Sequence, residues 1–196
     1  METDDETIHT RLVVNCAGPW ATHVAAMVGV DLPIQVHRQP TSLFSGPADY
    51  TPGRPCFSDG ENRIYYRNAG DAMTRTGVFG VIEDPANPDD FDETIDLEQQ
   101  RSIRRALHQR GERLRRTTAF GGFSALYDMT PDGHPIISQF PEVDGFWSNC
   151  GWSGNGFASA PAVGGCIAQL ITGGGSDIDL SMFGWPRPGG TEKMVY

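Results

Sequence analysis

Hydrophobic and polar positions divide the chain into short segments, the first of which covers residues 10–28. Residues 10–20 form an apolar run rich in β-branched side chains and ending in Gly-Pro, which predicts a buried, parallel strand that leads into a turn. From Trp20 to Val28 apolar residues recur with helical spacing, and Gly29 marks the end of that helix. The chain therefore opens with strand, turn and helix, which is half of a nucleotide-binding unit.

The middle of the chain has the pattern of an antiparallel sheet, because runs of β-branched and aromatic residues alternate with clusters of Gly, Pro, Asp and Asn. Strands are expected at residues 32–45, 63–68, 73–82, 120–127, 135–138 and 145–149. One helix interrupts this sheet, since a single apolar stripe follows an acidic lead-in suited to a helix N-terminus. The stripe consists of Ile95, Leu97, Ile103, Leu107 and Leu114.

A glycine-rich turn and a long helix follow near the end of the sequence. The turn is Gly151-Trp-Ser-Gly-Asn-Gly-Phe157, and Gly173-Gly-Gly175 ends the helix expected over residues 157–171. The face of this helix predicted to be buried carries Phe157, Ala160, Val163, Gly164, Ile167, Leu170 and Ile171. The tail over residues 181–196 is rich in Pro and Gly and is expected to be irregular.

Composition narrows the classes of function. A net charge of −10 disfavours nucleic acid and anionic membranes as partners. No apolar run reaches the roughly 18 residues that a spanning helix needs, and the acidic start lacks the features of a signal peptide, so we expect a cytoplasmic protein. Without a Cys-x-x-Cys pair or clustered His, neither a metal site nor a disulfide framework is expected. The cysteines, expected to be reduced and mostly buried, are Cys16, Cys56, Cys150 and Cys166.

The glycine-rich turn is the main candidate for chemistry. Three glycines in seven residues let the backbone approach a ligand closely, and the next helix offers free N–H groups and the positive end of its dipole. A planar ring that becomes anionic on reduction would be stabilised there. A plain loop with a glycine-rich cap explains the motif equally well on its own.

Three motifs in a fixed order carry a family resemblance. They are Val13-Val-Asn-Cys-Ala-Gly-Pro-Trp20, Tyr127-Asp-Met-Thr-Pro-Asp-Gly-His-Pro-Ile-Ile137 and Asn149-Cys-Gly-Trp-Ser-Gly-Asn-Gly-Phe157. Together they resemble the C-terminal part of FAD-dependent oxidoreductases of the D-amino-acid oxidase type, notably sarcosine oxidase, dimethylglycine dehydrogenase and glycine oxidase. The likeness runs from residue 11 to about Phe183.

The resemblance implies a mixed α+β fold: part of a Rossmann-like FAD-binding domain joined to an antiparallel substrate domain. Its implied boundaries are 1–34 for the first piece of the FAD domain, 35–132 for the substrate domain and 133–196 for the return to the FAD domain. It also implies that Tyr127 lies near the substrate, although a core aromatic residue is an equal alternative. The implied cofactor-binding residues are Ala17, Gly18, Trp20, Gly151, Ser153, Gly154, Asn155, Gly156 and Phe157.

Three further positions bear on the implied mechanism. Sarcosine oxidases attach the flavin through a cysteine where this chain has Ala125, so the resemblance implies non-covalent FAD here. Arg75 stands where those oxidases place a lysine implicated in oxygen activation. Its guanidinium keeps the positive charge of that lysine but differs in shape, so both an oxidase and a dehydrogenase stay open as activities. Arg38, followed by Gln39, could bind a substrate carboxylate or make a structural ion pair.

The strand–Gly-x-Gly-x-x-Gly–helix that grips the FAD pyrophosphate is not found in these 196 residues. We therefore expect the C-terminal half of an enzyme that oxidises the C–N bond of an amino acid or a secondary or tertiary amine by hydride transfer to flavin. A separate chain carrying the Gly-rich half is one expected partner. The alternative is a non-catalytic subunit or degenerate remnant that serves as a binding or assembly module.

Competing motifs are weaker. Residues 101–116 contain seven arginines, but the interspersed leucines and the acidic chain favour a solvated helix face over nucleic-acid binding. His134 has no catalytic companion at a useful spacing and is expected in a turn. Ser153 lacks the second glycine of a nucleophile elbow, so a hydrolase is disfavoured.

Overall fold

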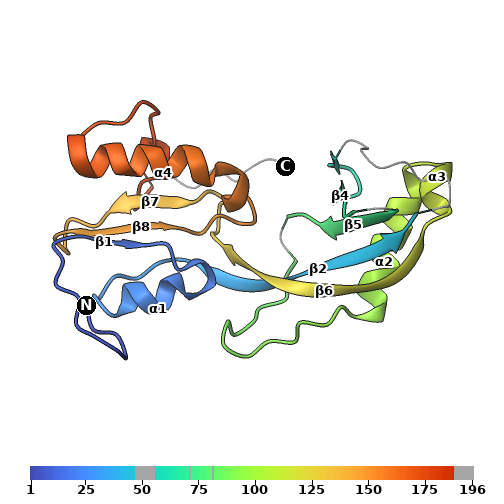
Figure 1. The fold of residues 1–196 in the computed structure, drawn as a ribbon, viewed down its shortest axis with the longest axis horizontal. Helices are drawn as coiled ribbons and strands as arrows, with labels where there is room; N and C mark the ends of the chain where they lie inside the picture. The colour runs from blue at the N-terminus through green and yellow to red at the C-terminus, as the bar shows by residue number, and fades with distance from the viewer. Residues whose placement is uncertain (47–55, 71, 81, 188–196) are drawn as a thin grey trace. The chain divides into compact units, whose positions relative to one another are not determined.

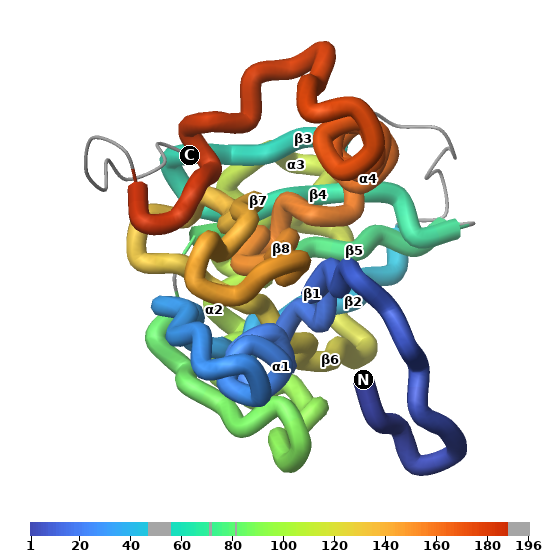
Figure 2. The backbone as a smooth tube through the Cα atoms, turned by 90° about the vertical axis from the view of Figure 1, so that its left-hand side faces the viewer, coloured from blue at the N-terminus to red at the C-terminus, as the bar shows by residue number. Residues whose placement is uncertain are grey.

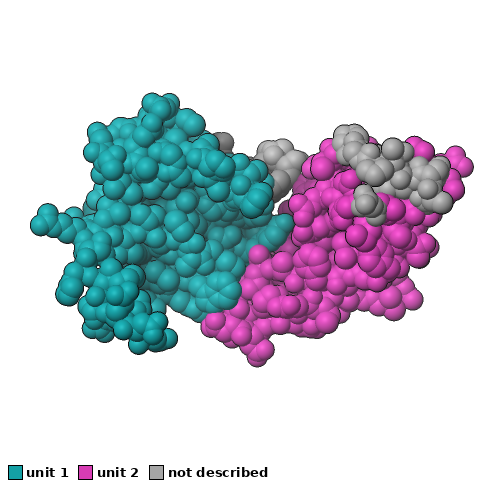
Figure 3. All heavy atoms as spheres, viewed as in Figure 1, with its two compact units in different colours: residues 1–35, 127–195 teal, residues 36–126, 196 magenta. Residues whose placement is uncertain are grey.

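The computed structural model describes residues 1–46, 56–70, 72–80 and 82–187. These residues fall into two compact units (Figure 3). One combines Met1–Gln35 with the described residues from Tyr127 onward, and the other consists of Val36–Leu126. Each unit is described separately below.

The first unit is built on a three-stranded sheet in the order β1-β8-β7. The strands are β1 (Val13–Asn15), β7 (Ile136–Gln139) and β8 (Phe146–Cys150). β1 runs parallel to β8, and β7 pairs with β8 antiparallel. The parallel pairing predicted for the opening strand is confirmed, but the strand has three residues because only this part of the 10–20 run pairs with β8.

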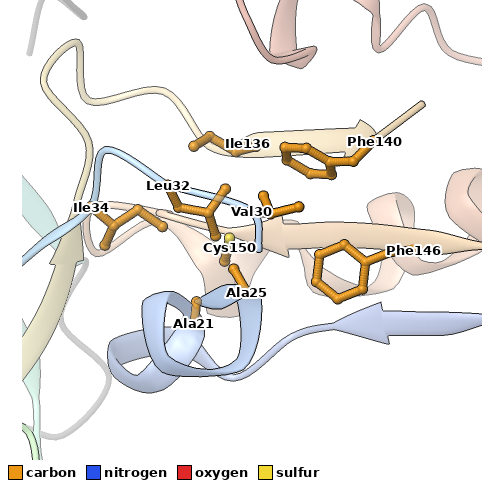
Figure 4. Packing of buried hydrophobic residues seen from close by; sticks show 9 residues of the cluster. All are labelled: Ala21, Ala25, Val30, Leu32, Ile34, Ile136, Phe140, Phe146 and Cys150. Carbon is orange, nitrogen blue, oxygen red and sulfur yellow. The ribbon is translucent and has the colours of Figure 1, made fainter. Parts of the chain in front are cut away.

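Helices cover both faces of this sheet (Figures 1 and 2). The first helices are η1 (Gly18–Trp20) and α1 (Ala21–Ala26), and the later ones are α4 (Gly156–Gly173) and η2 (Ser181–Phe183). Neighbouring residues alternate between two cores: Ile136 packs with α1, whereas Ile137 packs with α4. Figure 4 shows the core on the α1 side, which contains Ala21, Ala25, Val30, Leu32, Ile34, Ile136, Phe140, Phe146 and Cys150. Burial on both faces explains why β1 and β7 each carry two adjacent apolar residues, Val13-Val14 and Ile136-Ile137.

The second unit is an antiparallel sheet with a helix on one face. Its strand order is β3-β4-β5-β2-β6, and β2 to β5 pair antiparallel wherever they are neighbours. The strands are β2 (Gln35–Ser45), β3 (Phe57–Asp59), β4 (Ile64–Asn68), β5 (Met73–Val78) and β6 (Thr118–Met129). Ile103 and Leu107 of α2 (Leu97–Gln109) pack on Phe44, Ile64 and Tyr66 of the sheet. The mixed fold with an antiparallel sheet is therefore confirmed.

Several details of the sequence prediction were wrong. The single helix expected from the apolar stripe that ends at Leu114 divides into α2 and α3 (Glu112–Arg115), because Gly111 adopts a φ of 154° between them. The short strand β3 was missed. On α4 the buried stripe begins at Val163, so the expected core residues Phe157, Ala160 and Gly164 are exposed. Two of the four thiols, Cys16 and Cys56, are exposed rather than buried.

No helix in the described part of the chain is both long and apolar enough to cross a bilayer.

Candidate functional site

The glycine-rich turn begins directly after β8 and has a left-handed backbone at three positions. The φ angles are 71° at Gly151, 51° at Ser153 and 91° at Gly154. Glycine adopts this conformation without strain, whereas a side chain such as that of Ser153 makes it costly. The surrounding structure must therefore hold the turn in place.

Asp128, at the end of β6, supplies that support. Its Oδ2 accepts a hydrogen bond of 2.7 Å from the Gly151 N–H, and its backbone carbonyl accepts one of 3.0 Å from the Ser153 N–H. The Thr130 N–H in turn donates to Ser153 Oγ at 3.4 Å. Burial raises the pKa of the Asp128 carboxyl, although the N–H groups of Gly151 and Trp152 act in the opposite direction. The turn is thus fixed to residues 128–130 through polar contacts.

Two of the turn's glycines are required by contacts within the chain. A Cβ at Gly154 would lie 2.3 Å from Cε2 of Tyr127, and one at Gly151 would lie 2.5 Å from Cγ2 of Thr130. The Tyr127 ring therefore lies directly against the turn, and the close approach allowed by Gly154 serves this ring. The sequence prediction placed a ligand at these bare positions and missed that the chain itself fills part of the space.

The start of α4 is open by comparison. Among the described residues no side-chain hydrogen bond caps α4 at its N-cap position, and Phe157 in the first turn is 97% exposed. The first N–H groups of a helix have no intrahelical partner, and an 18-residue helix directs a positive dipole end toward them. These residues fit an aromatic ring system that takes up negative charge on reduction.

The predicted nucleotide-side residues lie at the same edge of the sheet. Because β1 and β8 are parallel, with Asn15 opposite Ser148, Ala17 and Gly18 follow β1 at the end where Gly151 follows β8. Asn15 is buried; its side chain donates to the Ala21 carbonyl at 2.8 Å and accepts from the Ala17 N–H at 3.2 Å. Ligands of open α/β sheets bind beyond the carboxyl ends of the strands, so this edge is the expected place for one.

Gly18 and Trp20 leave room at that edge. Gly18 has a φ of 53°, and a Cβ there would meet no atom within 4 Å. Trp20 is 41% exposed. Within this unit the structure brings together the start of η1, the turn and the first residues of α4.

Arg38 and Arg75 belong to the second unit, and their surroundings differ. The Arg38 guanidinium lies 3.2 Å from Asp84, 3.9 Å from Asp92 and 3.6 Å from Asp96. This is the structural ion pair that the sequence left as one of two alternatives. Arg75 on β5 instead places its guanidinium carbon 4.8 Å from the centroid of the Phe123 ring.

The sequence analysis gave no role to Asp128, and it also missed a second buried carboxylate, that of Asp132. Arg187 donates from Nε to Asp132 Oδ2 at 2.7 Å and from Nη2 to Asp132 Oδ1 at 3.2 Å. It also donates to the carbonyls of His134, Pro135 and Gly184. The available signal was the sequence Asp128-Met-Thr-Pro-Asp132, in which two aspartates flank a short segment that precedes the glycine-rich turn.

Comparison with known proteins identifies the family. The family model described as FAD dependent oxidoreductase matches residues 1–170. The chain belongs to the FAD-dependent oxidoreductase family. This confirms the resemblance on which the site residues were predicted, and the FAD dependence of the family is thereby established.

Two relatives of this FAD-dependent oxidoreductase chain are sarcosine enzymes by name. Mitochondrial sarcosine dehydrogenase of Mus musculus is 28% identical over 186 residues, which cover 92% of this chain and 20% of that protein. Monomeric sarcosine oxidase of Bacillus sp. is 28% identical over 190 residues, covering 90% of this chain and 47% of the relative. The chain thus spans less than half the length of each of these two relatives.

Solved structures show the same fold. L-proline dehydrogenase from P. horikoshii superposes with a TM-score of 0.75 at 24% identity, over 88% of this chain and 46% of that one. Glycine oxidase from Geobacillus kaustophilus superposes with a TM-score of 0.72 at 21% identity, over 91% of this chain and 46% of its own. Both likenesses concern architecture alone.

Proposed function

We propose that this chain forms the substrate-domain and flavin-facing part of an oxidoreductase that oxidises the C–N bond of an amino acid or of a secondary or tertiary amine. The observation that carries the proposal is the shared edge of β1 and β8, where Gly18, the glycine-rich turn and the open start of α4 meet in a chain of an FAD-dependent family. A dinucleotide-binding segment from outside these 196 residues completes the FAD site.

Bound FAD would supply an acceptor for the hydride of the C–H bond next to the amine nitrogen. The residues of this chain would supply position and charge. Gly156 and Phe157 are the first two residues of α4, and their N–H groups would stabilise negative charge that develops beside them. Tyr127, held against Gly154, would border the substrate. Ala125 has no thiol, so the proposed FAD is held without a covalent bond to that position.

Within this proposal the residues keep the division expected from the family: 1–34 and 133–196 serve the cofactor, and 35–132 serve the substrate. Arg75 keeps a positive charge on the substrate side. We leave Arg38 out of the reacting groups because its guanidinium lies beside three carboxylates.

The test is to co-express the chain with a strand–Gly-x-Gly-x-x-Gly–helix segment and to measure flavin absorbance at about 450 nm. The wild-type complex should be yellow. Phe157→Ala should lower its flavin content several-fold, because it removes an exposed aromatic contact at the start of α4. Met27→Ala is the matched control, since Met27 is 81% exposed and lies away from that edge, just after α1.

The result also decides between the two readings of the sequence. A complex that stays colourless with added FAD would contradict the proposal and favour a non-catalytic binding or assembly module. Equal flavin content in the Phe157→Ala and wild-type complexes would show that the ring lies elsewhere.

A further inference from the structure

Among the described residues of the second unit, α2 packs on one face of the five-stranded sheet, and no helix of this unit lies on the other face. Ile64 and Tyr66 on β4 point toward α2, together with Phe44 on β2. Since successive side chains of a strand alternate, Arg67 on β4 and Arg75 on β5 point to the opposite face. We call this the uncovered face.

Arg67 and Arg75 are direct cross-strand partners in the β4–β5 register. Side chains at such positions have Cβ atoms roughly 5 Å apart, and like charges placed there destabilise the sheet. Neither arginine forms an ion pair with a described carboxylate. The chain does not lack acidic residues, because it has 25 against 15 basic ones.

The side chain of Arg75 is fixed in place. Its register partner on β2 is Leu43, and β2 lies between β5 and β6, so the guanidinium crosses β2 to reach the ring of Phe123 on β6. Its Nε–H is buried and has no acceptor among the residues that the structure describes. A buried donor left without a partner costs free energy that a bound acceptor would recover.

Two hydroxyl groups lie beside the arginines on the same face. Tyr65 Oη is 3.1 Å from Thr41 Oγ1, and both residues are register partners of Gly77. Gly77 makes room for the phenol, because a Cβ there would lie 2.5 Å from Tyr65 Oη. The uncovered face therefore offers two cations and a pair of hydroxyl groups, and its described residues offer no carboxylate to neutralise them.

From this arrangement we propose that Arg67 and Arg75 form an anion site, and that the substrate of the proposed reaction carries two carboxylate groups. Guanidinium groups bind carboxylates through paired N–H donors, and two arginines balance the charge of a dicarboxylate. The assignment of the anion to the substrate rests on the proposed function, whereas the anion site itself can be tested without flavin.

Malonate is a suitable probe, since it carries two carboxylates and no amine to oxidise. Calorimetric titration of the full chain should show saturable binding of malonate, at least about tenfold tighter than that of acetate. Arg67→Gln and Arg75→Gln should each weaken malonate binding by about tenfold or more. Arg101→Gln on α2, which removes an exposed arginine outside the uncovered face, should leave it unchanged.

Absence of saturable binding, equal binding of acetate and malonate, or equal effects of Arg67→Gln and Arg101→Gln would overturn the proposal. Arg67 is exposed, so its substitution keeps the test valid even if the half-buried Arg75 is needed for folding. A complex that binds malonate but no flavin would contradict the proposed function while leaving the anion site intact. A yellow complex that does not bind malonate would contradict the anion site while leaving the proposed function intact.

Discussion

Two arginines with buried or half-buried side chains, one in each unit, differ in whether their N–H donors have acceptors. The side chain of Arg187 is 5% exposed and binds Asp132 with two hydrogen bonds, while three backbone carbonyls accept its remaining donors. Arg75 is half-buried against Phe123, and its buried Nε–H finds no acceptor in the described part of the chain. A fully satisfied arginine is built into the fold. One with an unsatisfied donor is available to a ligand.

Removing Arg187 should have the largest effect on stability. Arg187→Ala leaves the carboxylate of Asp132, 2% exposed, without its counter-charge, and breaking one partner of such a pair costs about 3–5 kcal/mol. Urea unfolding followed by circular dichroism would measure the loss. A change below about 1 kcal/mol would mean that the pair does not hold residues 184–187 in place.

Two neighbouring aspartates should respond to pH in opposite directions. Burial raises the pKa of Asp132, but Arg187 and the His134 N–H outweigh it, so the pKa lies below 3.8 and the stabilisation is lost as pH falls through it. Burial keeps the pKa of Asp128 above 3.8; its stabilisation is complete below that pH and is lost as pH rises through the raised value.

Asp132→Asn and Asp128→Asn make this difference measurable. We expect the stability deficit of Asp132→Asn relative to wild type to shrink, and that of Asp128→Asn to grow, as pH is lowered from about 6 to about 3. Urea unfolding at several pH values provides the test. Deficits that change in the same direction would show that Arg187 does not distinguish the two carboxyls.

Removing Arg75 should barely affect the fold. Arg75→Met keeps an apolar stem over Phe123, loses a cation–π contact and relieves the repulsion from Arg67, so the net change should stay within about 1 kcal/mol. Thermal unfolding compared with Arg187→Ala would show the contrast. A loss as large as that of Arg187→Ala would place Arg75 among the structural arginines.

The smallest effect is expected for an arginine in solvent. Arg105 lies 2.9 Å from Glu98, but the side chains are 65% and 71% exposed. Arg105→Ala should therefore change the free energy of unfolding by less than about 0.5 kcal/mol, and salt should reduce even that difference. It serves as the baseline for the other arginine substitutions.

Local patterns in the sequence predicted most of the elements. The apolar stripe containing Ile103 and Leu107 identified α2, and the β-branched run over residues 10–20 identified β1 and its parallel pairing. These signals work because each depends on residues a few positions apart. The end of α2 was missed because Leu114 continues the stripe beyond Gly111, which breaks the helix.

Long-range polar contacts could not be predicted in the same way. Asp132 and Arg187 are far apart in the sequence, and no period or motif links them. The turn at Gly151–Gly156 was located from its glycines, but the roles of Asp128 and of the Tyr127 ring in shaping it depend on the end of β6 returning to β8. The predicted roles of the turn residues toward FAD stay predictions, which the Phe157 and Met27 variants address.

The pairing of Val13 with Phe146 sets an order for folding during synthesis. The described residues between 36 and 126 form a unit with its own core, and its strands find neighbours soon after they are made. The opening strand and α1 must wait until β8 has emerged. For that interval Val13, Ala21 and Ala25 lack the later half of their core, so this segment exposes apolar surface while the second unit folds.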